Sequence, residues 1–249
     1  MAGHSKWSQI KRKKAVLDAK RGARFTRLIR EITVAARAGG GDPDGNPRLR
    51  LAIETAKSQN MPHDNIERAV KKGTGELEGV TYEEATYEGY GPGGAAIMVE
   101  VTTDNPNRTV AEIRHAFSKH GGNLGAPNSV AWMFDRRGQL CLDASTLDED
   151  TALEAALDAG AEDVLTEDDR YIVSTDPTSL HSVHERLISA GLKPEDVEIG
   201  MIPKSTVQVT GKDAEKLLRL MSALDDNDDV SNVFSNFDID AETLATAGE

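Results

Sequence analysis

Apolar residues recur at helical spacing in the first third of the chain. Phe25, Leu28, Ile29 and Ile32 follow an i, i+3, i+4, i+7 pattern, which predicts an amphipathic helix with one face turned toward a core. Most of the basic residues in this stretch fall away from that face. The pattern therefore indicates a folded segment instead of a loose basic tail.

Two more helices are predicted after the loop at residues 39–47, which is rich in Gly, Asp and Pro. Asn46 and Pro47 have the chemistry of an N-cap and a first helical residue. A third helix is expected to start at Pro62 and to stop at Gly73. The three helices together predict a small helical domain.

The pattern changes from Tyr87 onward, where apolar strand-like runs alternate with amphipathic stretches. The polar connector before it is expected to carry no strand. In chain order we expect strand 95–102, helix 109–120, strands 129–134 and 138–143, helix 149–159, a strand pair within 164–175, helix 178–190, strands 197–202 and 205–210, helix 212–224 and strand 230–237.

This order predicts an α+β multidomain protein: an N-terminal helical domain followed by two ferredoxin-like α+β domains, one inserted in the other. The expected boundaries are residues 1–78 for the helical domain, 79–134 with 203–240 for the first α+β domain, 135–202 for the inserted domain, and 241–249 for a tail.

Composition narrows the class of protein. The chain has 249 residues, of which 38% are hydrophobic and only 4% aromatic. No run approaches the length of about 18 apolar residues that a membrane-spanning helix needs, and the N-terminus lacks the apolar stretch of a secretory signal. The single cysteine, Cys141, rules out an intrachain disulfide. A cytoplasmic protein is expected.

Charge is distributed unevenly. The whole chain carries 29 Lys and Arg against 42 Asp and Glu. The segment from Met1 to Lys72 holds 17 of the basic residues against 7 acidic ones, so the segment from Gly73 to Glu249 holds 12 against 35. Such asymmetry points to nucleic-acid contact by the basic part, with the acidic remainder confining docking to one face.

No motif nominates an enzyme or a cofactor. The glycines of GYGPGG at residues 89–94 match a dinucleotide fingerprint in spacing, but they precede a strand instead of opening a helix, which favours a turn. No Walker A sequence and no G-x-S-x-G are present. Cys141 lies in an apolar alternation typical of a core residue. We therefore expect a non-enzymatic protein without a cofactor.

No metal site is expected either. His181 and His184 are spaced for one ion on a helix, but no cysteine or third histidine is near, and zinc needs three or four ligands. The acidic segment at residues 225–229 lacks the glycine and glutamate of a calcium loop. It is expected to be a solvated turn.

The basic N-terminal segment is the main candidate site. Cations neutralise phosphates, and an aromatic ring stacks on an unpaired base. The alternative is a solvated helix face with Trp7 in the core. The predicted nucleic-acid-binding residues are Lys6, Trp7, Lys11, Arg12, Lys13, Lys14, Lys20, Arg21, Arg24, Arg27 and Arg30.

A weaker basic cluster lies within the acidic part of the chain. Its members are Arg108, Arg114, His115 and Lys119, on and beside the helix expected at residues 109–120. The sequence leaves open whether this secondary patch extends the phosphate-binding surface or pairs with neighbouring carboxylates.

Several blocks of sequence resemble the YebC family: MAGHSKW, KRGARFTRLIREITVAAR, GGGDPDGNPRLR, NMPHDNIERAVKKG, YEGYGPGGAAIMVE and NRTVAEIRHAFSKHGGNLG. The resemblance covers nearly the whole chain and is strongest up to residue 135. Two positions depart from the family pattern. Pro106 stands where a second basic residue is usual, and Asn128 where glycine is expected.

The resemblance implies three domains and a non-enzymatic role in gene expression. Bacterial members are described as DNA-binding transcriptional regulators, and mitochondrial relatives as translational activators. The leading expectation is a DNA-binding transcriptional regulator. The alternative is a ribosome-associated translation factor that binds rRNA or tRNA, and a small-molecule sensor is a third possibility that rests on fold analogy.

Overall fold

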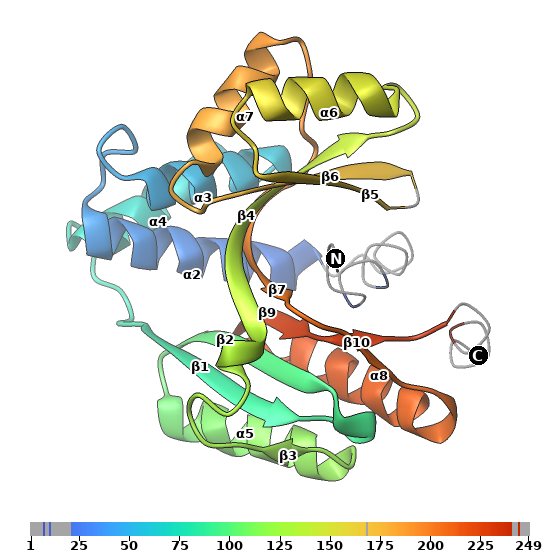
Figure 1. Cartoon of the computed structure of the whole chain (residues 1–249). Coiled ribbons are helices and arrows are strands. Elements are labelled where there is room, and N and C mark those ends of the chain that lie inside the picture. Colours follow the sequence, from blue (N-terminus) through green and yellow to red (C-terminus); the bar gives the residue numbers. More distant parts are fainter. Residues whose placement is uncertain (1–6, 8–9, 11–20, 168, 241–243, 245–249) are drawn as a thin grey trace. The chain divides into compact units, whose positions relative to one another are not determined.

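A computed structural model describes residues 7, 10, 21–167, 169–240 and 244, apart from the side chains of residues 21–23 (Figure 1). These residues form two compact units. One consists of Met133–Thr206, and the other of the described parts of Lys6–Trp132 and Val207–Glu249. Within the described residues, no helix is long and apolar enough to cross a membrane.

The N-terminal helices are α2 (Arg21–Gly39), α3 (Pro47–Ser58) and α4 (His63–Thr74). Asn46 caps α3 by accepting a hydrogen bond from the Leu49 N–H, and Pro47 is the first helical residue. The predicted start of this helix is confirmed. The core of the three helices is built from alanines and larger aliphatic side chains: Ile32, Ala35, Ala36, Leu49, Ala52, Ala56, Met61, Ile66 and Ala69.

Gly73 allows α4 to approach α2 closely. A Cβ at this position would lie 2.5 Å from the Thr33 carbonyl oxygen and 2.6 Å from Ala36 Cβ. Only a residue without a side chain fits this contact. The helix continues one residue past the predicted stop at Gly73 and ends at Thr74. Its C-cap is Gly75, which has a left-handed conformation (φ +84°).

The first sheet has the strand order β3-β1-β2-β9 and is antiparallel throughout. Its strands are β1 (Glu83–Tyr90), β2 (Ala96–Thr103), β3 (Asn123–Leu124) and β9 (Val230–Ser235). The helices α5 (Pro106–Lys119) and α8 (Gly211–Asp225) share its core through Ile113, Phe117, Leu217, Leu220 and Met221. Two short strands, β8 (Val207–Gln208) and β10 (Phe237–Asp238), pair in parallel.

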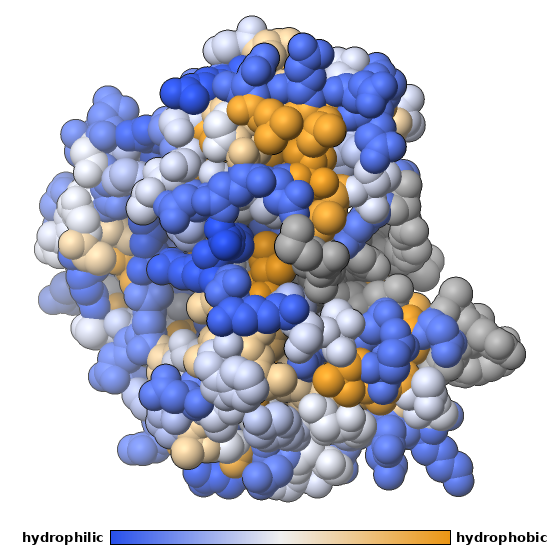
Figure 2. All heavy atoms as spheres, viewed as in Figure 1, coloured by the Kyte–Doolittle hydropathy of each residue, from blue (hydrophilic) through white to orange (hydrophobic). Residues whose placement is uncertain are grey.

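The unit Met133–Thr206 has the element order βαββαβ. It comprises β4 (Phe134–Asp143), α6 (Glu149–Asp158), β5 (Asp163–Glu167), β6 (Arg170–Thr175), α7 (Leu180–Ser189) and β7 (Val197–Pro203). The strand order β5-β6-β4-β7 is that of a ferredoxin-like domain. Leu140, Ile172 and Leu187 are fully buried, whereas Leu153 and Leu157 of α6 are exposed, and Figure 2 shows apolar atoms beside this helix.

The predicted α+β multidomain fold is confirmed, and most elements lie where the pattern places them. In the first sheet, however, the central strands β1 and β2 form a hairpin joined by the turn at Pro92–Gly94, so its connections differ from the ferredoxin-like order. Gly91, Gly93 and Gly94 therefore lie in a turn, as expected, whereas Gly89 belongs to β1.

Three strand assignments were wrong. The segment expected as a strand at 129–134 holds a turn and the short helix η2 (Ala131–Met133), and the short strand that pairs with β1 is β3. The strand expected at 205–210 is only two residues long, Val207–Gln208. β1 begins inside the polar connector, where no strand was expected. It was missed because its outer residues face solvent and give no apolar alternation.

Candidate nucleic-acid interface

The predicted N-terminal site residues differ in where the structure places them. Arg21 lies in the first turn of α2, and Arg24, further along this helix, has an exposed side chain. Six cations lie outside the described residues: Lys6, Lys11, Arg12, Lys13, Lys14 and Lys20. Trp7, Arg27 and Arg30 are described individually, and all three are directed toward other parts of the chain.

Trp7 belongs to the core between the first sheet and its helices. Only 5% of the residue is exposed, and the partly buried Ile10 packs against the same core. The indole has a large apolar surface whose burial is favourable. The prediction that Trp7 stacks on an unpaired base is wrong for this fold, and the alternative, a core tryptophan, is correct.

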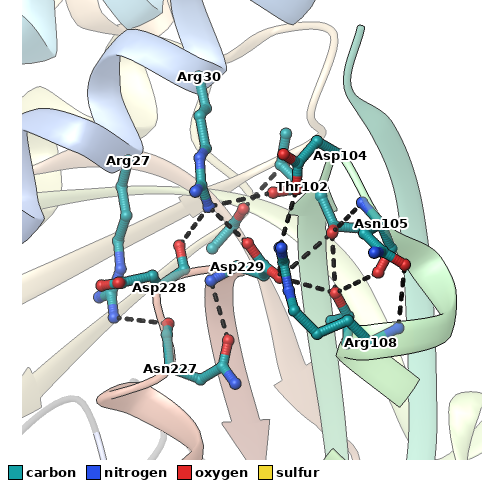
Figure 3. Close-up of polar contacts among 12 residues, drawn as sticks. Arg27, Arg30, Thr102, Asp104, Asn105, Arg108, Asn227, Asp228 and Asp229 are labelled. Atoms are coloured by element: carbon teal, nitrogen blue, oxygen red, sulfur yellow. Dashed lines mark hydrogen bonds and ion pairs between the residues drawn. The ribbon is translucent and has the colours of Figure 1, made fainter. Parts of the chain in front are cut away.

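Arg27 reaches the turn between α8 and β9 (Figure 3). Its Nη2 donates to the carbonyl oxygens of Asp225 and Asn227, the latter at 3.4 Å, and its Nη1 lies 3.6 Å from the Asp225 carboxylate. The side chain is 21% exposed. Its charge is thus already matched within the protein.

Arg30 lies one turn further along α2 and reaches the same turn. Its Nη1 donates to Asp229 Oδ1 at 3.0 Å, to the Asp228 carbonyl oxygen, and to the Thr102 carbonyl oxygen at 3.4 Å. The guanidinium also lies 5.5 Å from the centroid of the Tyr82 ring, within the range of a cation–π contact.

Asp229 is the centre of this network, and its side chain is only 4% exposed. It accepts hydrogen bonds from Arg30, from Arg108 Nη2 at 2.6 Å, from Thr109 Oγ1 at 2.7 Å and from Thr103 Oγ1 at 3.2 Å. We call these five residues the Asp229 cluster. Burial raises the pKa of Asp229, but the hydrogen bonds and charges of its partners outweigh burial, so the pKa is lowered.

The Asp229 cluster joins α2, α5 and the α8–β9 turn. The prediction that residues 225–229 form a solvated turn is therefore wrong at Asp229, which is buried because three elements meet there. Arg27 and Arg30 pair with residues of the α8–β9 turn. The phosphate contacts predicted for them would therefore have to displace existing ion pairs. No sequence pattern indicated this, since partners 198 residues apart share no local signal.

The secondary basic patch is divided by the structure. Arg108 pairs with Asp229 and, at 2.8 Å, with Asp104. Arg114, His115 and Lys119 are carried along α5, and Arg114 and Lys119 are exposed. Pairing with carboxylates, one of the two alternatives that the sequence left open, thus holds for Arg108. Arg114 and Lys119 face solvent, and a role for them in binding phosphate stays a prediction.

Further cations lie beside the C-terminal end of α5. Lys216 and Arg219 are carried by α8. His120, which caps α5, has a lowered pKa because of burial and then because of the charges of Lys119, Arg219 and His115. Sequence reasoning missed the contribution of α8, because its basic residues alternate with acidic ones along the chain.

One group of possible metal ligands occurs among the described residues. His181, His184 and Glu185 of α7 have ligand atoms within 4.8 Å of one another, and Glu185 is a third member that the sequence argument did not include. His184 Nδ1 lies 3.7 Å from the Glu185 carboxylate. All three come from one surface helix, α7.

The geometry defines a class of protein: a helical basic domain joined to antiparallel α+β domains, with internal arginine–aspartate pairing and exposed cations on α2, α5 and α8. Comparison with family models identifies the family. Residues 5–76 match the model described as the TACO1/YebC protein N-terminal domain, and residues 82–237 match the TACO1/YebC second and third domain. The chain belongs to the TACO1/YebC family.

Individual relatives agree with this assignment. A protein of Acidithiobacillus ferrooxidans is 62% identical over 98% of both chains, and one of Desulfotalea psychrophila is 57% identical over the full length of both. Both are named probable transcriptional regulatory proteins. The crystal structure of a conserved hypothetical protein from Aquifex aeolicus is similar with a TM-score of 0.84 and 51% identity, covering 91% of this chain and 94% of the other.

Proposed function

We propose that the chain is a non-enzymatic regulator of gene expression that binds nucleic acid, with DNA as its target in transcriptional control. The observation that carries this proposal is charge segregation. The segment from Met1 to Lys72 holds 17 Lys and Arg against 7 Asp and Glu, and the rest of the chain has the reverse excess. The relatives' names support a role in transcription.

The phosphate contacts are assigned to the predicted N-terminal cations other than Arg27 and Arg30. These are Lys6, Lys11, Arg12, Lys13, Lys14, Lys20, Arg21 and Arg24. Arg27 and Arg30 instead anchor α2 to the α8–β9 turn, so they orient the basic segment. Such binding reads phosphates and carries no base specificity by itself.

A second candidate function is that of a ribosome-associated translation factor, with rRNA or tRNA as the target. The observation in its favour is the acidic remainder of the chain, which holds 12 Lys and Arg against 35 Asp and Glu. Long duplex DNA repels such a surface, whereas a ribosomal pocket contacts a limited face.

Two measurements test the proposal. Promoter-DNA binding at physiological salt is expected to be tight, and ribosome co-sedimentation to be weak. Weak DNA binding together with strong ribosome co-sedimentation would favour the second candidate function over the first. Alanine at Lys11, Arg12, Lys13 and Lys14 is expected to reduce the slope of log affinity against log salt by about 3–4 for duplex DNA. An unchanged slope would exclude the basic segment as the binding site.

A further inference from the structure

The helix α6 turns its largest apolar side chains toward solvent. Its buried residues are the small Ala152 and Ala156, whereas Leu153 is 41% exposed and Leu157 is 53% exposed. Figure 2 shows apolar atoms over this helix, bordered by hydrophilic ones. A surface helix usually turns its leucines toward the core, so α6 departs from the ordinary arrangement, and its two leucines stay uncovered in the described structure.

The two leucines lie beside the edge of the sheet of their own unit. Glu149, Leu153 and Leu157 recur every four residues, so they form one row along α6. Glu149 Oε1 accepts a hydrogen bond from Thr166 Oγ1 at 2.9 Å, which places this row on the side of β5, the first strand in the order β5-β6-β4-β7. Val164, two residues before Thr166, faces the same side of the sheet and is half-buried. We call Leu153, Leu157 and Val164 the α6–β5 strip.

The α6–β5 strip is distinct from the depression between α6 and α7. The α6 residues that line this depression include Ala155 and Ala159, and α7 contributes Arg186. Each leucine of the strip lies two residues before one of these alanines, which is about 200° around the helix. The strip therefore lies on the side of α6 that is turned away from α7.

A row of carboxylates runs next to the leucines. Asp150, Glu154 and Asp158 also recur every four residues, each one position after a member of the leucine row, and all three are exposed. We call them the α6 carboxylate row. The surrounding sequence adds no opposing charge, because residues 138–169 hold 11 Asp and Glu and no Lys or Arg. The apolar strip is thus bordered by a strongly negative surface.

We propose that the α6–β5 strip docks a basic amphipathic helix of a protein partner. Apolar side chains of that helix, spaced at i, i+3, i+4 and i+7, pack on the strip, and its lysines and arginines face the α6 carboxylate row. Helical segments are commonly recognised through apolar anchors at this spacing. This interaction goes beyond the proposed binding of nucleic acid and uses a different part of the chain.

Charge complementarity decides between the possible occupants. A nucleic acid would bring its phosphates against the carboxylates, which is unfavourable. A second copy of this chain would bring two carboxylate rows together along the same strip, and like charges that face each other across an interface weaken it. A basic helix satisfies both features, because it covers the leucines and neutralises the carboxylates.

The experiment uses the full-length protein and a labelled synthetic helix of about four turns, built from Leu and Lys with the leucines on one face. A second peptide of the same composition has its leucines scattered around the helix. Anisotropy titrations at physiological salt are expected to show binding of the patterned peptide about tenfold tighter than that of the scattered one. On binding, the methyl NMR signals of Leu153, Leu157 and Val164 are expected to shift, and those of Ile188 to stay unchanged.

Leucine variants test the apolar contact. Leu153→Ser with Leu157→Ser is expected to lower the affinity for the patterned peptide about tenfold, to the level of the scattered peptide. Ile188→Ser is the matched control, because it removes an apolar side chain that is 47% exposed on α7, and it is expected to bind like the wild type. The methyl spectrum of each variant checks that it is folded.

Charge variants test the carboxylate row. Glu154→Gln with Asp158→Asn is expected to lower the affinity for the patterned peptide about threefold at low salt and to flatten its salt dependence. Glu78→Gln with Glu83→Gln removes the same charge from exposed positions outside this unit. This control is expected to have a smaller effect, which separates a local contact from the net charge of the protein.

Several outcomes would overturn the proposal. Equal affinity for the two peptides would show attraction by charge alone, and equal affinity of the leucine variant and the wild type would exclude the strip as the contact. A wild-type dimer in sedimentation equilibrium that the leucine variant loses would assign the strip to a second copy of the chain. None of these measurements involves nucleic acid, so failure of this proposal leaves the proposed function standing.

Discussion

At the scale of single residues, Asp229 has the largest expected effect on stability. Its carboxylate is buried and shared by Arg30, Arg108, Thr103 and Thr109. Asp229→Asn leaves the hydroxyl donors an acceptor but removes the charge that matches the guanidinium groups. We expect a loss of about 2–3 kcal/mol in the free energy of unfolding, measured by urea denaturation.

The control for this prediction is Asp104→Asn. Asp104 pairs with the same Arg108, but its side chain is 40% exposed, and exposed pairs contribute little. We expect no measurable change in unfolding free energy for this variant. Equal losses for the two variants would show that burial of Asp229 is not what makes its ion pairs important.

The Asp229 cluster also predicts a pH dependence. The folded protein lowers the pKa of Asp229, so its stabilising contribution is full above the carboxyl pKa of the unfolded chain, about 3.9. It is lost as the pH falls from that value through the lower pKa of the folded state. The stability difference between the wild type and Asp229→Asn is therefore expected to shrink between about pH 5 and pH 2. Denaturant titrations across this range check it, and a constant difference would contradict it.

At the scale of elements, close packing of α2 and α4 depends on Gly73. A methyl group there meets the Thr33 carbonyl oxygen and Ala36 Cβ at distances below van der Waals contact. We expect Gly73→Ala to destabilise the helical domain by about 1–3 kcal/mol, measured by thermal unfolding. Glu54→Ala at an exposed position of α3 is the control and should change stability by less than about 0.5 kcal/mol.

The loop between β3 and β4 depends on Glu88 in a similar way. Glu88→Gln keeps the shape of the side chain but places an amide N–H₂ group against backbone donors. We expect faster hydrogen exchange at the amides of Asn128, Val130 and Ala131, and unchanged exchange in α4 as an internal control. Unchanged exchange in the loop would show that the carboxylate does not hold it.

The elements also show what sequence pattern predicts and what it does not. The helices α2, α6 and α8 were predictable because their buried residues recur at helical spacing. β1 was missed because its outer half is exposed, and the strand expected at residues 129–134 was wrong because its apolar residues include the exposed Trp132. The family departure at Asn128 has a structural explanation: its φ is +65°, which favours glycine but which asparagine tolerates.

The candidate site was harder to predict than the fold. Charge alone identified the basic segment, but it could not show that Arg27 and Arg30 pair with the α8–β9 turn, nor which tryptophan is buried. Those facts depend on contacts between distant segments. Charge composition can be read along the chain, whereas the partner of each charged side chain depends on the fold.

At the scale of the whole molecule, the acidic remainder is expected to oppose binding to long duplex DNA. Glu154 and Asp158 lie on α6, and Glu154→Gln with Asp158→Asn removes two charges without disturbing a core. If the acidic surface limits docking, this double variant should bind random duplex DNA about two- to fivefold more tightly at low salt. The gain should vanish near 1 M salt, where screening acts within about 3 Å.

Leu157→Ala, between the two positions, is the uncharged control. Equal affinity of the double variant and the wild type at low salt would remove the electrostatic argument for a ribosomal target and leave DNA as the target that the relatives' names favour.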